Sequence, residues 1–143
     1  MTDPETLSDD AVEVPPPFEG EQVLNFDDFD VKEKDYGFWV FMTFHGDNGE
    51  KASWSGNFYT DASRADAEKG KGRTQSHAIA WRGLKEFFKA TGMTDGDLPK
   101  SSPRGIATAL GKMVNVNGDC QRVRATLGVD NKGYTTAGRF KAA

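Results

Sequence analysis

The sequence has little of the chemistry on which most enzyme active sites depend. It contains one cysteine, Cys120, so no disulfide can form within the chain. It contains only two histidines, His45 and His77, and no cluster of Cys and His at the spacing of metal ligands. Each histidine is therefore interpreted as an ordinary surface or edge residue, and neither a cofactor nor a metal is predicted.

A complete phosphate-binding loop is also missing. Such a loop needs two glycines separated by four residues, with Lys and then Ser or Thr after the second one. In the segment Gly70-Lys71-Gly72-Arg73-Thr74, Ala65 stands at the position of the first glycine and Gly72 follows the lysine. Nucleoside triphosphate binding is excluded on this basis. The segment is predicted to be a basic loop, which either lies along a phosphate backbone or is simply solvated.

Acidic residues give only a weak indication of metal-dependent catalysis. Asp27, Asp28 and Asp30 lie close together in the sequence, as the ligands of a two-metal nuclease would. No downstream carboxylates follow at matching positions on strands, and residues 47–50 lack the calcium-loop pattern. The protein is therefore not expected to be an enzyme, and a nuclease that depends on these aspartates is kept as an alternative.

Long hydrophobic runs are absent as well. The longest strongly apolar stretch, residues 37–44, is far shorter than the ~18–20 residues of a membrane-spanning helix. The first residues are acidic and carry neither the basic nor the apolar part of a signal peptide. These absences predict a cytoplasmic protein with no membrane segment.

The net charge of −4 conceals two oppositely charged regions. Residues 1–35 carry 12 acidic and 2 basic side chains, whereas residues 36–143 carry 10 acidic and 16 basic ones. Residues 1–20 include Pro15-Pro16-Pro17 and are predicted to form a disordered acidic tail before a folded domain at 21–143. The positive balance of the second region favours a polyanionic partner, although such a division of charge also arises from solubility alone.

Alternating hydrophobic residues predict a chain made mainly of β-strands. Strands are predicted over residues 22–32 (with a bulge near Asp27-Asp28), 38–45, 52–60, 122–129 and 134–141, and a short additional strand around 114–116 is left open. Turns are predicted at residues 46–49 and 130–133, where Gly follows Asn or Lys. Each predicted hairpin therefore joins two neighbouring strands.

One long helix is predicted between the third and fourth strands. Trp81, Leu84 and Phe88 recur at helical spacing, Thr74 or Ser76 can begin the helix, and Gly92 can end it. A loop or short second helix is expected around residues 106–110. This order predicts a five-stranded OB-type barrel with one α-helix between strands three and four. A mixed α+β sheet with a helix on one face is the alternative.

Basic residues interleaved with aromatic ones are the strongest functional signal that remains. Single-stranded nucleic acids are bound by cations that neutralise the backbone and by flat rings that stack on bases. Trp39 and Phe41 are the best stacking candidates, because residues on the other face of the same strand already supply the core. Trp54 and Tyr134 follow, although an aromatic residue on a strand lies in the core more often than on a ligand-binding surface.

The cations of the last two strands complete the predicted site. If those strands pair through the 130–133 turn, Arg122, Arg124, Arg139 and Lys141 lie on one ribbon. The full set of candidate nucleic-acid-binding residues is Trp39, Phe41, Trp54, Lys71, Arg73, Lys112, Arg122, Arg124, Lys132, Tyr134, Arg139 and Lys141.

The arrangement resembles the small OB-fold single-stranded-DNA-binding proteins of tailed bacteriophages over roughly residues 20–143. The resemblance lies in the aromatic strands at 38–44 and 54–59, the helix at 78–88 that ends at Gly92, Leu110-Gly111-Lys112, and the segments 123–125 and 133–140. It implies sequence-tolerant binding of single-stranded DNA in phage replication or recombination. One departure is that the acidic region lies at the N-terminus, whereas such proteins commonly carry it at the C-terminus.

The expected partners follow from this interpretation. They are single-stranded DNA and, through the acidic tail, replication or recombination proteins; a homodimer is left open. The alternative is a structural or partner-binding protein, such as a virion component or an inhibitor, built on the same small barrel.

Overall fold

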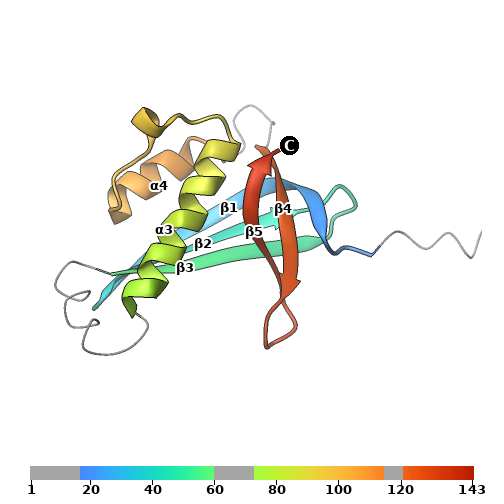
Figure 1. The fold of residues 1–143 in the computed structure, drawn as a ribbon, viewed down its shortest axis with the longest axis horizontal. Coiled ribbons are helices and arrows are strands. Elements are labelled where there is room, and N and C mark those ends of the chain that lie inside the picture. Colours follow the sequence, from blue (N-terminus) through green and yellow to red (C-terminus); the bar gives the residue numbers. More distant parts are fainter. Residues whose placement is uncertain (1–16, 60–72, 115–120) are drawn as a thin grey trace, which may run out of the picture.

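The computed structural model describes residues 17–59, 73–114 and 121–143 of the chain (Figure 1). Within these ranges the chain forms five strands, two α-helices and one 3₁₀ turn. In chain order they are β1 (Glu21–Lys34), β2 (Gly37–His45), β3 (Lys51–Tyr59), α3 (Arg73–Ala90), η1 (Asp95–Asp97), α4 (Pro103–Gly111), β4 (Arg122–Val129) and β5 (Thr135–Ala142). Of the predicted acidic tail, residues 1–16 lie outside the described residues.

The five strands form one sheet that closes in a ring in the order β1-β2-β3-β5-β4. Neighbouring strands are antiparallel except at the closure between β3 and β5, where Ser53 lies opposite Thr136 in a parallel pair. β1 is long enough to pair with β2 over one half and with β4 over the other. The mainly β character and the five predicted strands are thus confirmed.

A β-bulge in β1 shapes the side of the ring on which the candidate site lies. The register steps from Phe26 opposite Phe44 to Asp28 opposite Thr43, which leaves Asp27 as the extra residue. An extra residue bends its strand and redirects the side chains around it. Here it brings the carboxylate of Asp27 to the imidazole of His45, the last residue of β2. The bulge predicted near Asp27-Asp28 is confirmed.

The core fills the inside of the ring and the space beneath the helices. In β2 the burial alternates residue by residue, as the sequence predicts, with Phe38, Val40, Met42 and Phe44 buried. Phe87 of α3 reaches into the same cluster and contacts the rings of Phe26, Phe44 and Phe140. One aromatic cluster therefore joins four elements: β1, β2, α3 and β5.

Two α-helices cover the sheet, where one was predicted. α3 packs against β3 and β5, and it is followed by Gly92 in the left-handed region at φ 103°. α4, in the region where a loop or short helix was expected, packs against β1. Its N-terminus is capped by Ser102, whose hydroxyl accepts a hydrogen bond of 3.0 Å from the N–H of Gly105. Of the short strand left open around residues 114–116, residues 115 and 116 lie outside the described residues, and Val114 is not in a strand.

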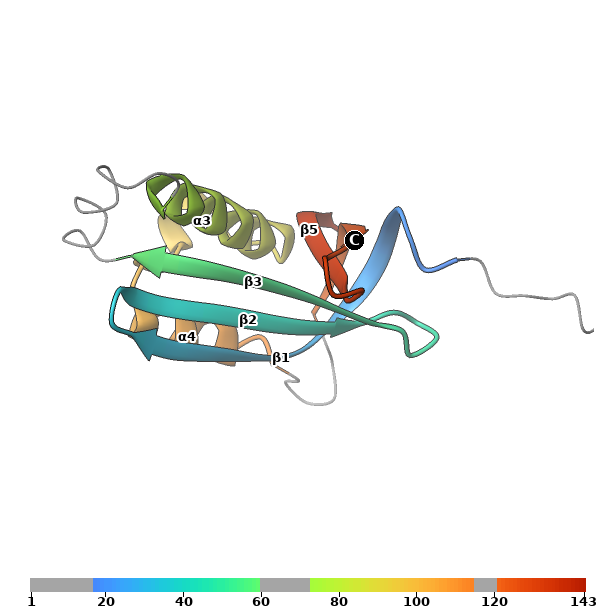
Figure 2. The same ribbon diagram turned by 90° about the horizontal axis from the view of Figure 1, so that it is seen from below.

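The three long strands leave their outer face uncovered by either helix. Figure 2 shows β1, β2 and β3 side by side, with α3 beside β3 and α4 behind the strands. On β2, the residues that point outward are Trp39, Phe41, Thr43 and His45, and all four are half-buried. None of the helices in the described part of the chain is long and apolar enough to span a membrane.

Candidate functional site

The outer face of β2 presents two aromatic rings that stack on each other. The ring centroids of Trp39 and Phe41 lie 5.3 Å apart, and the ring planes differ by 14°. Both side chains are half-buried, so each ring keeps part of its surface available. Lys32, directly opposite Trp39 on β1, places its Nζ 5.8 Å from the centre of the indole. The prediction that these two rings lie outside the core is confirmed.

Two tyrosines extend this set of rings toward the β1–β2 turn. Tyr36 and Tyr59 have ring centroids 4.8 Å apart. The hydroxyl of Tyr36 donates a hydrogen bond of 2.6 Å to Oδ1 of Asn57, which lies opposite Trp39 in the register. Burial, and secondarily the nearby Tyr59, raise the pKa of the Tyr36 hydroxyl, which therefore stays protonated at neutral pH. We refer to Tyr36, Tyr59, Trp39 and Phe41 as the aromatic row.

The sequence analysis did not select these tyrosines. Tyr59 lies an even number of residues from Asn57 on β3, so the alternation of that strand already indicates its outward position. Tyr36 precedes β2 in the turn after β1, where no periodicity applies. Only the fold shows that its ring returns to the same face.

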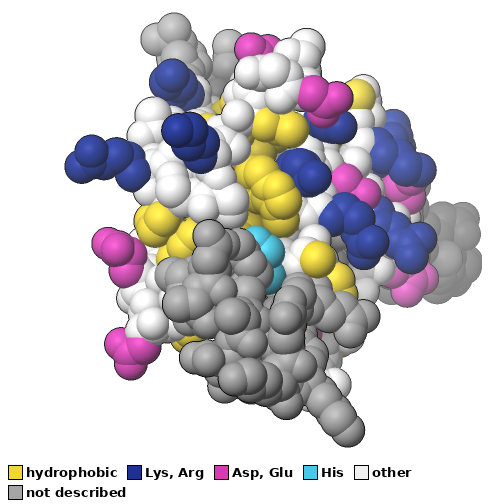
Figure 3. All heavy atoms as spheres, turned by 60° about the vertical axis from the view of Figure 1, so that its left-hand side comes forward, with side chains coloured by type: hydrophobic (Ala, Val, Ile, Leu, Met, Phe, Trp, Pro, Cys, Tyr) yellow, Lys and Arg dark blue, Asp and Glu magenta, His cyan; other side chains and the backbone are white. Residues whose placement is uncertain are grey.

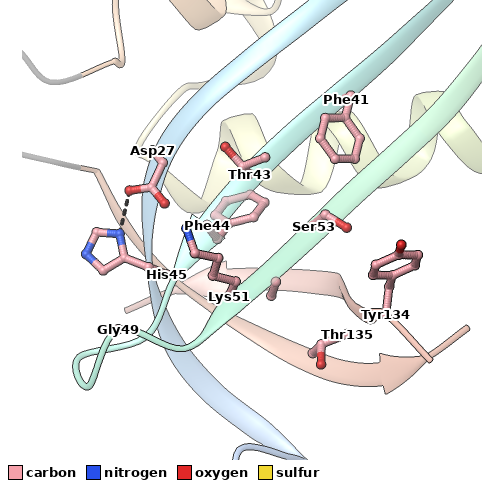
Figure 4. A pocket seen from close by; sticks show the side chains of 11 residues that line it. Asp27, Phe41, Thr43, Phe44, His45, Gly49, Lys51, Ser53, Tyr134 and Thr135 are labelled. Atoms are coloured by element: carbon pink, nitrogen blue, oxygen red, sulfur yellow. Dashed lines mark hydrogen bonds and ion pairs between the residues drawn. The ribbon is translucent and has the colours of Figure 1, made fainter. Parts of the chain in front are cut away.

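A groove of about 750 Å³ opens beside the Phe41 end of the aromatic row. It lies between the outer face of β2 and β3 and the turn that joins β4 to β5, and we refer to it as the β2–β3 groove (Figure 4). It is lined by Asp27, Phe41, Thr43, Phe44, His45, Gly49, Lys51, Ala52, Ser53, Tyr134 and Thr135. The groove thus combines rings, hydroxyls and charged groups.

Tyr134 is held over this groove by a hydrogen-bonded turn. Oδ1 of Asp130 accepts hydrogen bonds of 2.9 Å from the backbone N–H groups of both Lys132 and Tyr134. Gly133 completes the turn in the left-handed region at φ 86°, a backbone conformation that residues other than glycine rarely adopt. The ring of Tyr134 is 65% exposed. Tyr134 and Phe41 both line the groove.

Charged side chains gather at the other end of the groove. Nδ1 of His45 is in hydrogen-bond contact with Oδ1 of Asp27. Lys51 lies directly opposite His45 on β3, and both line the groove. Among the described residues, no carboxylate lies within ion-pair distance of Lys51. His45 and Lys51 were not selected from the sequence, because nothing in a single sequence indicates that a bulge brings an aspartate to this histidine.

Most cations of the predicted ribbon are already paired with carboxylates. β4 and β5 do pair through the 130–134 turn, with Arg124 opposite Lys141. Glu21 lies 3.2 Å from Nζ of Lys141 and 4.0 Å from Arg124. Nη1 of Arg122 donates to Oδ1 of Asp47 at 3.0 Å. Figure 3 shows one group of Lys and Arg side chains at its right, with acidic side chains among them, and further Lys and Arg side chains at its upper left.

The Arg122–Asp47 pair also fixes the end of β2. The hydrogen bond from Arg122, together with one from Asn25, holds the pKa of the Asp47 carboxyl below its ordinary value, and Asp47 in turn raises the pKa of Arg122. The amide of Asn25 also donates to the backbone carbonyl of His45 at 3.2 Å. Arg122, one of the predicted nucleic-acid-binding residues, therefore has a structural role: it ties β4 to the turn after β2.

The remaining candidate residues lie in several places. Arg139 is exposed, has φ 51°, and lines a second groove of about 520 Å³ with Arg82 of α3. Trp54 points to the helix side of β3, where an added Cβ at Gly83 would lie 3.0 Å from its Nε1. It is not brought together with the aromatic row.

Four further predicted cations lie away from the groove, in turns, at a helix end or outside the described residues. Lys112 follows α4 and is exposed, and Lys132 is exposed in the β4–β5 turn. Lys71 lies outside the described residues, and Arg73 begins α3 without a described side chain.

The three aspartates considered for a metal site point to different partners. Asp27 contacts His45, Asp28 accepts a hydrogen bond of 2.8 Å from the N–H of Phe29, and Asp30 lies 3.7 Å from Lys32. Across residues 17–59, 73–114 and 121–143, no three His, Cys, Asp or Glu side chains come together in a way that could hold a metal ion. The aspartate cluster in the sequence is thus not a cluster in space.

Comparisons with known proteins do not identify a family for this chain. No protein-family model matches it, and no curated protein sequence matches it.

Proposed function

We propose that this protein binds single-stranded DNA, without strong sequence preference, on the outer face of β2 and β3. The observation that carries the proposal is the stacked pair of Trp39 and Phe41, half-exposed on a sheet face that neither described helix covers. Rings in this position stack on bases of any sequence, because every base has a flat π face. The neighbouring Tyr36, Tyr59 and Tyr134 provide further stacking surfaces.

The order of the strands also favours the outer face of β2 and β3 as the binding surface. A ring in the order β1-β2-β3-β5-β4, with helical elements between β3 and β4, supports the OB-type barrel that we propose for this chain. Barrels of this type bind oligonucleotides on strands two and three and on the loops that follow strands one and four. In this chain those two loops carry Tyr36 and Tyr134. The strand order and the positions of the rings are two independent observations, and both favour the outer face of β2 and β3.

By its resemblance to phage single-stranded-DNA-binding proteins, the protein acts in DNA replication or recombination, in the cytoplasm of a host cell. It holds DNA and does not transform it. The acidic region at residues 1–20 then serves to contact other proteins of that process. These assignments depend on the binding activity and are tested after it.

A structural or partner-binding role is the second candidate. It is favoured by Val129, which is 73% exposed, and by Tyr134 across the same hairpin. Exposed apolar side chains grouped on one hairpin suit contact with another protein. In that case the aromatic row would have no affinity for nucleic acid.

Titration of a fluorescently labelled oligo-dT and of a matching duplex, each at two salt concentrations, tests the proposal. We expect the single strand to bind more tightly, and to bind more weakly as salt rises. Trp39→Ala should weaken binding roughly 5- to 150-fold, equivalent to the ~1–3 kcal/mol of one stacked base.

Trp81→Phe is the matched control. Trp81 lies on α3 and packs against the ring of Phe58, away from the outer face of β2. This variant should bind like the unaltered protein once both are shown to be folded. Absence of binding at low salt, or equal affinity of the Trp39→Ala and Trp81→Phe proteins, would contradict the proposal.

A further inference from the structure

The β2–β3 groove changes in chemical character from one end to the other. Figure 4 shows the rings of Phe41 and Tyr134 on one side and Asp27, His45 and Lys51 on the other. The hydroxyls of Thr43 and Ser53, which lie opposite each other on β2 and β3, stand between the two ends. Phe41 and His45 are four residues apart, so the two ends are separated by about 13 Å of strand.

This gradient matches the parts of a nucleotide unit. A base needs a flat apolar surface, a deoxyribose can lie against polar side chains that donate to its ring oxygen, and a phosphate needs cations or N–H donors. The groove provides these three environments in that order. Stacking on the aromatic row alone would not require a charged end.

We propose that the β2–β3 groove holds one nucleotide of the bound strand, with its phosphate on Nζ of Lys51 and on the Nε2–H of a protonated His45. Asp27 is the positioning residue that orients the imidazole. This inference depends on the proposed binding of single-stranded DNA, and it adds a defined phosphate contact whose strength changes with pH.

The contact with Asp27 determines which nitrogen of His45 can contact a phosphate. Asp27 occupies Nδ1, which leaves Nε2 as the nitrogen available to a ligand. In the neutral imidazole, with its proton on Nδ1, Nε2 carries a lone pair and repels a phosphate oxygen. In the imidazolium both nitrogens carry protons, so Nε2–H donates a charge-assisted hydrogen bond to the phosphate. Only the protonated form of His45 can therefore donate a hydrogen bond from Nε2 to the phosphate.

The charges around His45 are balanced when the imidazole is neutral. Asp27 faces it from β1, Lys51 faces it from β3, and Asp47 lies nearby in the turn, paired with Arg122 of β4. Two carboxylates thus oppose two cations, and protonation of His45 makes the local charge positive.

Two further acids near this end are occupied by the backbone. Glu50 accepts a hydrogen bond of 3.0 Å from the N–H of Asn48, and Asp28 accepts one from the N–H of Phe29. Neither carboxylate is paired with His45.

The pH dependence of DNA binding tests the inference. Oligo-dT is a suitable probe, since thymine does not take up a proton in weak acid, and ionic strength is held constant. Between about pH 8 and pH 5.5, where histidines titrate, we expect the full-length protein to bind roughly tenfold more tightly. His45→Gln should bind with the same affinity throughout this range. Lys51→Gln should weaken binding at every pH but keep the pH dependence.

His77→Gln is the matched control, because His77 is the only other histidine in the chain. Its Nδ1 accepts a hydrogen bond of 2.9 Å from the N–H of Tyr59, and glutamine can also accept one. This variant should keep the full pH dependence. Far-UV circular dichroism at each pH confirms that all the proteins compared are folded, and Lys51→Gln tests the phosphate contact if His45→Gln does not fold.

The two proposals can fail separately. If DNA binds and Trp39→Ala weakens it, but the pH dependence is the same with and without His45, the phosphate contact is wrong and the stacking function stands. If His77→Gln removes the pH dependence instead, the contact has been assigned to the wrong histidine. If no single strand binds at any pH, both proposals are overturned.

Discussion

The two faces of β2 carry similar residues and have different physical roles. Facing inward, Phe38 stacks on Phe58 of β3, with ring centroids 4.8 Å apart and planes within 1° of parallel. Facing outward, Trp39 stacks on Phe41 of the same strand in nearly the same geometry. The inner rings are buried, whereas the outer ones are half-exposed. A stacked pair is therefore not by itself evidence of a core or of a binding site; what decides is whether other protein atoms cover it.

The sharpest way to separate the two faces is to remove the same ring from each. Phe38→Ala removes a ring that is 5% exposed and should lower the free energy of unfolding by about 3–5 kcal/mol, because it leaves a cavity. Phe41→Ala removes a half-exposed ring and should lower it by less than about 1.5 kcal/mol. Urea denaturation followed by circular dichroism measures both values.

The effects on DNA binding should be in the opposite order. Phe41→Ala should weaken oligo-dT binding roughly 5- to 150-fold, whereas Phe38→Ala should leave the affinity of the folded fraction unchanged. If the two variants lose similar stability, or if Phe38→Ala weakens binding more than Phe41→Ala, the distinction between the faces fails.

Strict alternation made the faces of β2 predictable from the sequence. Four apolar residues at every second position leave only one orientation that buries them all, so Trp39 and Phe41 had to face outward. The bulge in β1 was predictable for the same reason, since its hydrophobic residues change phase near Asp27. Period-two patterns are local, and a single sequence contains them in full.

Contacts between distant segments could not be predicted in this way. The pairing of Glu21 with Lys141 joins residues 120 positions apart, and that of Arg122 with Asp47 joins residues 75 positions apart. Counting charges along the chain therefore overestimated the free cations of the last two strands. The contact between Asp27 and His45 was missed for the same reason.

Trp54 shows a different limit of prediction from the sequence. Trp54 shares a face of β3 with Gly56 and Phe58, but the sequence did not indicate that α3 would cover that face. Gly56 and Gly83 permit the close approach of the helix: an added Cβ at Gly56 would lie 2.8 Å from the Cβ of Ala80 and from the Trp54 ring. Paired glycines on a strand and a helix are a signal of close packing, and they could have indicated it.

The second prediction uses this tryptophan to test whether the helix side takes part in binding. Trp54→Ala should lower the free energy of unfolding by about 2 kcal/mol, less than a fully buried ring, because Trp54 is only half-buried against α3. Thermal unfolding measures the loss.

Oligo-dT affinity, measured well below the unfolding midpoint, should be unaltered in Trp54→Ala. Trp39→Ala serves as the comparison, with little loss of stability and a large loss of affinity. A large loss of affinity in folded Trp54→Ala protein would extend the binding surface to the helix side of β3.

The smallest expected effect concerns the paired cations of β4 and β5. Glu21 contacts both Arg124 and Lys141, so Glu21→Gln leaves these two cations without a carboxylate partner in the described part of the chain. If these cations reach the phosphates of the bound strand, oligo-dT should bind a few-fold more tightly at low salt. The slope of log affinity against log salt should steepen by up to about 1.4, since each additional phosphate contact contributes about 0.7 for a single strand.

Glu33→Gln is the control for the change in net charge. Glu33 also lies on β1, but it faces the side of Pro103 and Arg104 of α4, away from the aromatic row. It removes the same charge from the protein without freeing Arg124 or Lys141, so its salt slope should match that of the unaltered protein. If both glutamate variants gain affinity equally, the effect comes from net charge alone. If neither changes, Arg124 and Lys141 lie outside the path of the DNA, and the outer face of β2 and β3 binds mainly through its rings.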